Sequence, residues 1–228
     1  AAFAAAYLIF LRQPASERAM LALGASAANT GFIGYPIALQ VLGPIAGAAA
    51  GLTMLVENML IIPLALFLAE RAAKTGAPLR DAFMRVAKMP LIWAVLLGFA
   101  LSASGYQLPD LARKPIALVA ASSAPVALVF VGGVLSSLDL RALNAEPILL
   151  SLVKLLIHPL AVFAALQVFP HSPPELKTAA LIFAAAPVIT IYPLLGAPFG
   201  MEQRNAVYLM LSTLFAAITL PIALSLIG

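Results

Sequence analysis

Polar side chains inside long apolar runs are the residues of this sequence that can do chemistry. Glu57 lies in the run TMLVENMLI, next to Asn58. An ionisable group in a membrane-spanning segment is costly and marks a functional site by default. A carboxyl there can carry a proton, or bind a cation together with the neighbouring amide oxygen; a neutral carboxyl that only packs is the alternative. We therefore predict that Glu57 and Asn58 couple H+ or Na+ to a process in the membrane.

A second set of polar groups lies in the word NTGFIGYP, residues 29–36, inside another apolar run. Proline removes a backbone donor and glycine lowers helix propensity, so this word predicts a broken helix. The freed N–H and C=O groups cannot face lipid and must face protein or a wet cavity. An ordinary kink is the alternative, since both residues are frequent in membrane helices. The candidate substrate contacts here are Asn29, Thr30, Gly31 and Pro36.

A lysine and a histidine share one helical face in the run VKLLIHP, because Lys154 and His158 are four residues apart. A lysine at this position can hold a carboxylate substrate, or its long side chain can reach the membrane surface. The histidine can likewise contact an anion or only pack. Both residues are therefore candidate anion contacts with a structural alternative.

The composition decides the class of protein in which these side chains lie. Of the 228 residues, 63% are hydrophobic and 10% charged, and the mean hydropathy is +1.06. Soluble domains have about 45–50% apolar and about 25% charged residues, so we predict an integral membrane protein whose partners are lipid and not nucleic acid. The absence of cysteine excludes disulfides and thiolate sites. Two isolated histidines predict no metal site, and without a Walker motif or catalytic triad we expect neither a cofactor nor enzyme activity.

Eight apolar runs, separated by charge, proline and glycine, predict eight membrane-spanning helices. They lie near residues 1–11, 19–42, 46–69, 90–106, 115–138, 147–169, 176–200 and 205–227. Loops on the side of the segment from Glu70 to Lys88 hold nine Lys or Arg residues, and those on the other side hold three. The positive-inside rule therefore predicts that this segment is a cytoplasmic loop.

Three sequence words recur at a nearly constant offset of 157 to 160 residues: NTGFIGYP as APVITIYP, LIIPLALFL as AITLPIALSL, and FAAAYLIF as FAALQVF. The offset carries the first three spans onto the last three, five spans later, so the two copies cross the membrane in opposite directions. Such an inverted repeat is common in secondary transporters. It predicts an all-α fold of five plus five helices, of which the first two are absent from this chain.

The repeat pairs the first helix break with a second one at residues 187–193. Broken helices at matching places in two inverted halves point to a binding site. We therefore add Thr190, Tyr192 and Pro193 to the candidate substrate contacts. If the two broken helices cross, their half-helix N-termini offer partial positive charge to an anion. The place of Glu57 is taken in the second copy by Ser212 and Thr213.

Several of these words resemble one transporter family. The run AANTGFIGYPIALQVLG is similar to the signature span of the auxin efflux carrier family, which includes plant PIN-type carriers and bacterial relatives described as malonate transporters. The runs MPLIWAVLLGFALSASGYQLP, SSAPVALVFVGGVLS and VKLLIHPLAVF resemble the family's sixth, seventh and eighth helices. The resemblance implies ten helices in two inverted repeats, with Pro36 and Pro193 at the crossing of the fourth and ninth helices.

The resemblance also implies a division of the chain into a moving and a static part. Residues 1–69 and 139–228 would form a transport domain, residues 70–89 a loop, and residues 90–138 part of a scaffold through which a homodimer can form. The implied function is secondary transport of a small organic anion such as malonate, by alternating access at the helix crossing. One alternative is a sodium-coupled symporter of the related bile-acid type, with Glu57, Asn58, Thr190 and Thr213 as ligands. A non-transporting membrane sensor or anchor is the other.

Overall fold

The computed structural model describes residues 2–73, 80, 84, 87–88, 90–136 and 145–227, and these form helices with no β-strand among them. Within this part of the chain, three continuous helical stretches are long and apolar enough to cross a membrane: Ile45–Ala73, Ala145–Gln167 and Glu202–Leu226. The predicted all-helical membrane class is therefore confirmed. Most of the predicted cytoplasmic loop, residues 70–89, lies outside the described residues.

The second predicted span is divided into two helical pieces. Helix α2, Ala15–Ser26, is followed by extended residues 27–29, then by a π-helical segment, Thr30–Gly34, which continues into α3, Tyr35–Leu42. The break thus comes earlier than the sequence word suggested, and Pro36 lies in the first turn of α3. Proline is tolerated in a first turn because its missing N–H has little to bond there.

The seventh predicted span is divided in the same way. Helix α11, Pro174–Ala185, ends before the non-helical residues 186–191, and α12, Tyr192–Gly196, follows them. A short 3-10 turn, Ala197–Phe199, leads on to α13, Glu202–Ile227. Pro193 again lies in the first turn of the second helical piece. The second break therefore puts a proline just inside a new helix, whereas after the first break helical structure already begins at Thr30, before Pro36.

Two of the long helices contain a π-helical segment in their middle. Helix α4, Ile45–Val56, passes through the segment Glu57–Ile61 into α5, Ile62–Ala73. Helix α9, Ala145–Leu152, passes through Val153–Ile157 into α10, His158–Gln167. A proline, Pro63 or Pro159, follows two residues after each segment. Proline cannot donate to the carbonyl one turn back and clashes with it, which the wider π turn relieves.

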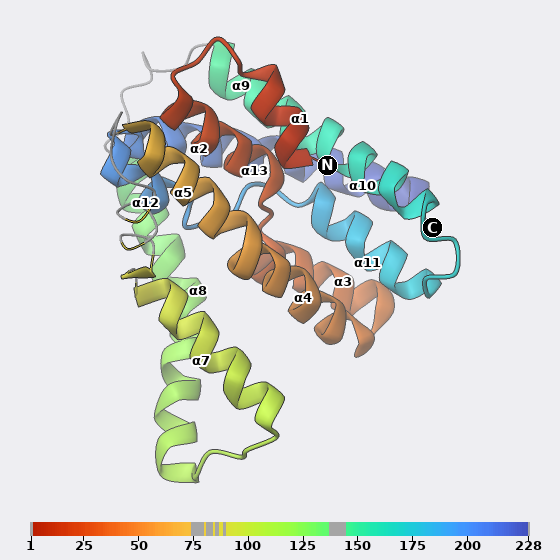
Figure 1. Cartoon of the computed structure of the whole chain (residues 1–228). Coiled ribbons are helices and arrows are strands. Elements are labelled where there is room, and N and C mark those ends of the chain that lie inside the picture. The colour runs from red at the N-terminus through yellow and green to blue at the C-terminus, as the bar shows by residue number, and fades with distance from the viewer. Residues whose placement is uncertain are drawn as a thin grey trace.

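The helices fall into a packed body and an arm (Figure 1). Helices α7, Pro90–Ser104, and α8, Asp110–Ser136, form the arm, and their described side chains are almost all exposed. The other helices, with α1 at Ala2–Ile9, form the body. Its larger core takes side chains from α1, α2, α5, α9, α12 and α13, and a smaller core takes them from α3, α4 and α11. Every residue from 19 to 30 is buried, so the first break lies deep inside this body.

Candidate functional site

The two helix breaks lie side by side and cross. Ala28 and Val188 form an isolated antiparallel bridge. The backbone N–H of Asn29 donates to the carbonyl of Pro187 at 2.8 Å, and its side-chain Nδ2 donates to Oγ1 of Thr190 at 2.7 Å. Only 6% of Asn29 and 5% of Thr190 is exposed. The pairing that two strands of a sheet would supply is made here by two interrupted helices.

Asn29 also caps the helix that starts after the break. Its Oδ1 accepts from the backbone N–H of Phe32 at 3.2 Å, and its carbonyl accepts from Gly34 at 2.9 Å. A capping side chain of this kind satisfies donors that the first helical turn leaves free. The amide group therefore joins both broken helices and still has one N–H and one oxygen lone pair that these bonds do not use.

Glu57 reaches the first break from the π-helical segment of the next helix. Its Oε1 accepts from the backbone N–H of Ala28 at 2.7 Å, and its Oε2 accepts from the hydroxyl of Thr30 at 3.3 Å. Only 6% of the residue is exposed. The carboxyl thus bonds a donor that the end of α2 has freed, and it brings an ionisable group to the crossing.

Lys154 approaches the second broken helix from the other π-helical segment. The side chain is fully buried, its Nζ donates to the carbonyl of Ala184 at 3.0 Å, and it lies 2.7 Å from Nδ1 of His158. It also interacts electrostatically with Glu57. The alternative in which this lysine reaches the membrane surface is therefore wrong. A position within a span does not reveal which face of the helix a side chain occupies.

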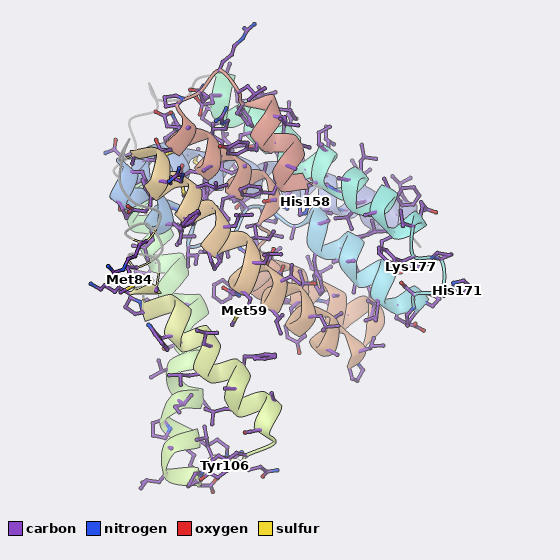
Figure 2. All side chains as sticks on the ribbon, in the orientation of Figure 1. Met59, Met84, Tyr106, His158, His171 and Lys177 are labelled. Atoms are coloured by element: carbon purple, nitrogen blue, oxygen red, sulfur yellow. The ribbon has the colours of Figure 1, made fainter. Side chains whose placement is uncertain are left out.

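A cavity of about 460 Å3 opens beside the crossing, between α1, α4, α10 and α11. Its polar lining consists of Ser26, Thr53, Glu57 and His158, and the rest is apolar. His158 lies where α1, α10 and α11 come together (Figure 2). The cavity is large enough for a small organic molecule, and one buried carboxyl and one imidazole face it.

The remaining predicted substrate contacts are spread around the crossing. The hydroxyl of Tyr192 is buried and donates to the carbonyl of Met20 at 2.8 Å, so this side chain ties α12 to α2. Pro193 is buried next to it, whereas Gly31 is half-buried and Pro36 is exposed. The structure therefore brings Asn29, Thr30 and Thr190 together with Glu57 and leaves the two prolines outside this set of contacts.

The predicted oxygen ligands of a sodium site point in different directions. The amide of Asn58 donates to the carbonyl of Met54 at 2.7 Å and lines a separate cavity of about 540 Å3 that reaches Phe99 of α7. The hydroxyl of Thr213 donates to the carbonyl of Leu209 at 2.7 Å. Neighbours in sequence point about 100° apart around a helix, which is why Asn58 does not follow Glu57 to the crossing.

Three polar contacts that α13 makes with the broken helices were not expected from the sequence. Val188 donates its backbone N–H to Oγ of Ser212 at 3.4 Å, Tyr208 donates its hydroxyl to the carbonyl of Gly24 at 2.8 Å, and Asn205 donates to the carbonyl of Tyr192 at 3.2 Å. The sequence repeat had already assigned Ser212 to the position equivalent to that of Glu57. Tyr208 lies in an apolar run and Asn205 at the polar start of the same helix, and neither was singled out by the sequence.

Metal chemistry finds no support in the part of the chain that the structure describes. No three His, Asp or Glu side chains gather there in a way that could hold an ion. The chemistry available at the crossing is hydrogen bonding by an amide and hydroxyls, together with the charges of Glu57 and Lys154.

Comparisons with known proteins agree with this picture of a membrane protein. A sequence profile of the family described as membrane transport protein matches residues 1–224. The chain is 26% identical over 219 residues to a Rhizobium meliloti (strain 1021) protein named "Putative malonate transporter", covering 93% of the chain and 68% of that protein. It is also 26% identical over 157 residues to "Uncharacterized transporter YfdV" of Escherichia coli (strain K12), covering 67% of the chain and 50% of that protein.

The family match extends over nearly the whole chain, and three helical stretches of the described residues are long and apolar enough to span a lipid bilayer. Its relatives are transporters and not enzymes. The chain therefore belongs to the membrane transport protein family, the auxin efflux carrier family that its helix-break word predicted.

Proposed function

We propose that this protein is a secondary transporter that carries a small organic anion across the membrane by alternating access, with the anion bound at the helix crossing. The observation that carries the proposal is the bridge between Ala28 and Val188, together with the bond from Asn29 to Thr190. Transporters built from inverted repeats bind substrate where two discontinuous helices meet near the middle of the membrane.

An anion suits the crossing because a helix begins there. The segment that starts at Thr30 directs its first N–H groups and the positive end of its dipole at the break. Asn29 and Thr190 add an amide N–H and a hydroxyl that can bind carboxylate oxygens, whereas the hydroxyl of Thr30 already donates to Glu57. The name of the Rhizobium meliloti relative points to a dicarboxylate of three carbons, which suits a cavity of this size.

We further propose that the two halves of the body are inverted repeats and move together. The recurring sequence words support this, and so do the matching contacts of Ala28 with Glu57 and of Val188 with Ser212. In this proposal residues 1–69 and 139–228 are the transport domain, and residues 90–138 belong to the scaffold. The exposed apolar faces of α7 and α8 suit contact with lipid or with a second copy in a homodimer.

Glu57 is the residue that we propose for coupling to protons. It is the carboxyl that binds the first break, and it lines the cavity in which a substrate would arrive. Sodium coupling has less support, because the side chains of Asn58 and Thr213 bond elsewhere. We place the protein in the bacterial inner membrane with residues 70–88 on the cytoplasmic side, on the strength of the charge distribution.

Transport is tested by uptake into proteoliposomes that contain the full-length protein. The probes are radiolabelled malonate, succinate, butyrate and benzoate, under separately imposed gradients of pH, sodium and voltage. We expect uptake of at least one of these carboxylates, and a pH gradient should drive it. Absence of flux for every carboxylate under every gradient would contradict the carrier function, and uptake that only a sodium gradient drives would replace proton coupling.

A further inference from the structure

The side chain of Lys154 lies where transporters of this architecture bind their coupling cation. Helix α11 ends at Ala185, and the last carbonyls of a helix have no partner within it. In inverted-repeat transporters, such half-helix C-terminal ends and unwound carbonyls coordinate the coupling ion. Here Nζ of Lys154 donates to the carbonyl of Ala184 at 3.0 Å. An ammonium group therefore fills the place of a bound cation at this helix end.

The negative partner of this ammonium is present as well. Glu57 interacts electrostatically with Lys154, and it bonds the backbone N–H of Ala28 at the end of the other interrupted helix. The two side chains therefore satisfy a freed donor of one break and a freed acceptor of the other. Both side chains are buried. The crossing thus carries one acidic and one basic side chain of its own.

The groups around Nζ of Lys154 are hydrogen-bond acceptors. A carbonyl oxygen can only accept, and Nδ1 of His158, at 2.7 Å, is a second acceptor in one tautomer of the ring. An ammonium supplies three N–H donors, which is enough to bond both of these acceptors. A sodium ion needs several oxygen ligands. Of the four predicted from the sequence, Asn58 and Thr213 bond to their own helices, while Thr190 bonds Asn29 and Glu57 bonds the first break.

We propose that Lys154 is the resident cation of the helix crossing, so that this protein needs no sodium ion to bind or carry its anion. The proposal rests on the proposed transport function for its consequences on flux. It also predicts the stability of the protein without substrate, because sodium does not stabilise a site that already holds its own cation. These two consequences can be measured separately.

The first test is the thermal unfolding of the purified full-length protein in detergent, in N-methyl-D-glucamine buffer with and without added sodium. A ligand at 100 times its Kd shifts a folding equilibrium by about 2.7 kcal/mol, which moves a melting temperature by several degrees. We expect sodium to leave the melting temperature of the wild type unchanged. We expect Lys154→Ala to melt lower and to recover part of the loss with sodium or ethylammonium, either of which can enter the vacated space. A sodium-dependent rise in the wild type would overturn the proposal.

The matched control is Lys177→Ala, which removes the same charge from a half-buried lysine in the first turn of α11, whose Nζ donates to the carbonyl of Pro170 (Figure 2). Its melting temperature should respond neither to sodium nor to ethylammonium. If Lys154→Ala does not fold, the double variant Glu57→Gln, Lys154→Ala removes both charges and keeps the test open. We expect this double variant to fold and to show no response to sodium.

The second test is uptake of the transported carboxylate with sodium replaced on both sides by N-methyl-D-glucamine. Wild-type uptake should change less than twofold, and Lys154→Ala should lose at least tenfold and regain most of it with ethylammonium. Wild-type uptake that requires sodium would overturn the proposal, as would full activity of Lys154→Ala in N-methyl-D-glucamine. Absence of uptake by the wild type in any buffer would reject the transport function, while the melting measurement would still decide the proposal.

Discussion

The two broken helices meet as near equivalents, but side chains of different chemistry bind them. At the first break the backbone N–H of Ala28 donates to the carboxyl of Glu57 at 2.7 Å, and at the second that of Val188 donates to the hydroxyl of Ser212 at 3.4 Å. Glu57 lies in a π-helical segment that ends two residues before Pro63. In contrast, α13 stays α-helical around Ser212 although it contains Pro221. One half thus supplies an ionisable group and the other a neutral one.

This difference shows that two helix breaks can keep the same backbone geometry while the side chains that bind them differ in chemistry. Both side chains satisfy a donor that the interrupted helix has freed, which any buried break requires. Only the carboxyl can also change its charge and pair with Lys154. The requirement of the fold is met on both sides, and the capacity to couple an ion is confined to one.

The largest expected effect is on the charged side of this comparison. Glu57→Ala leaves the buried N–H of Ala28 and the buried hydroxyl of Thr30 without their acceptor, and each such loss costs about 1–3 kcal/mol. Chemical unfolding of the full-length protein in detergent measures the change in the free energy of unfolding. A loss below about 1 kcal/mol would show that the carboxyl is not the partner of these groups.

A smaller effect is expected where the second broken helix presses on the first. A Cβ at Gly24 of α2 would lie 2.7 Å from the ring of Tyr192 and 2.8 Å from that of Tyr208. Overpacking of this kind costs about 1–3 kcal/mol, so Gly24→Ala should lower the free energy of unfolding by that amount. The control is Gly51→Ala, whose Cβ would meet no atom within 4 Å. This control should be neutral or stabilise by up to about 1 kcal/mol. Equal effects of the two changes would contradict the close packing.

Removing the hydroxyl of Tyr192 or of Tyr208 should lower the free energy of unfolding by less than the overpacking at Gly24 does. Tyr192 donates to the carbonyl of Met20 and Tyr208 to that of Gly24, both at 2.8 Å. Tyr192→Phe and Tyr208→Phe each remove one neutral hydrogen bond, worth about 0.5–1.5 kcal/mol. Because the two rings contact each other, with centroids 5.4 Å apart, the double variant tests their coupling. Unchanged unfolding in both single variants would show that these bonds do not hold α2.

The smallest effect is expected on the neutral side of the crossing. Ser212→Ala removes a hydroxyl that accepts one long hydrogen bond, so we expect a loss of about 0.5–1 kcal/mol and uptake within twofold of the wild type. The measurement is the same unfolding experiment as for Glu57→Ala. A loss equal to that of Glu57→Ala would remove the asymmetry between the two breaks.

Much of the body could be predicted because its signals are local. Short sequence motifs that contain glycine or proline indicated both interrupted spans, and a nearly constant offset in residue number related one span to the other. The start of the first break was misplaced, since Ala27 and Ala28 carry no signal and Pro36 fits the first turn of α3. A carboxyl alone in an apolar run identified Glu57 without any knowledge of its partners.

The partners of these side chains could not be predicted, because they depend on the face and crossing of helices far apart in sequence. Lys154 could equally have reached the membrane surface, and only the packing of α9 and α10 against α11 turns it inward. Tyr208 looks like an ordinary member of an apolar run, and Asn205 looks like part of the polar start of α13. One local signal was available but unused: Pro63 and Pro159 each follow a π-helical segment that carries a buried charge.

The central claim is that the helix crossing binds the transported anion, and Asn29 tests it most directly. Binding of radiolabelled malonate to the full-length protein should be compared for the wild type, Asn29→Ala and Gln167→Ala, which removes an exposed amide from α10. Thermal unfolding verifies that each variant is folded. We expect Asn29→Ala to lose at least tenfold in affinity while Gln167→Ala binds as the wild type does. Unchanged affinity in a folded Asn29→Ala variant would contradict the account.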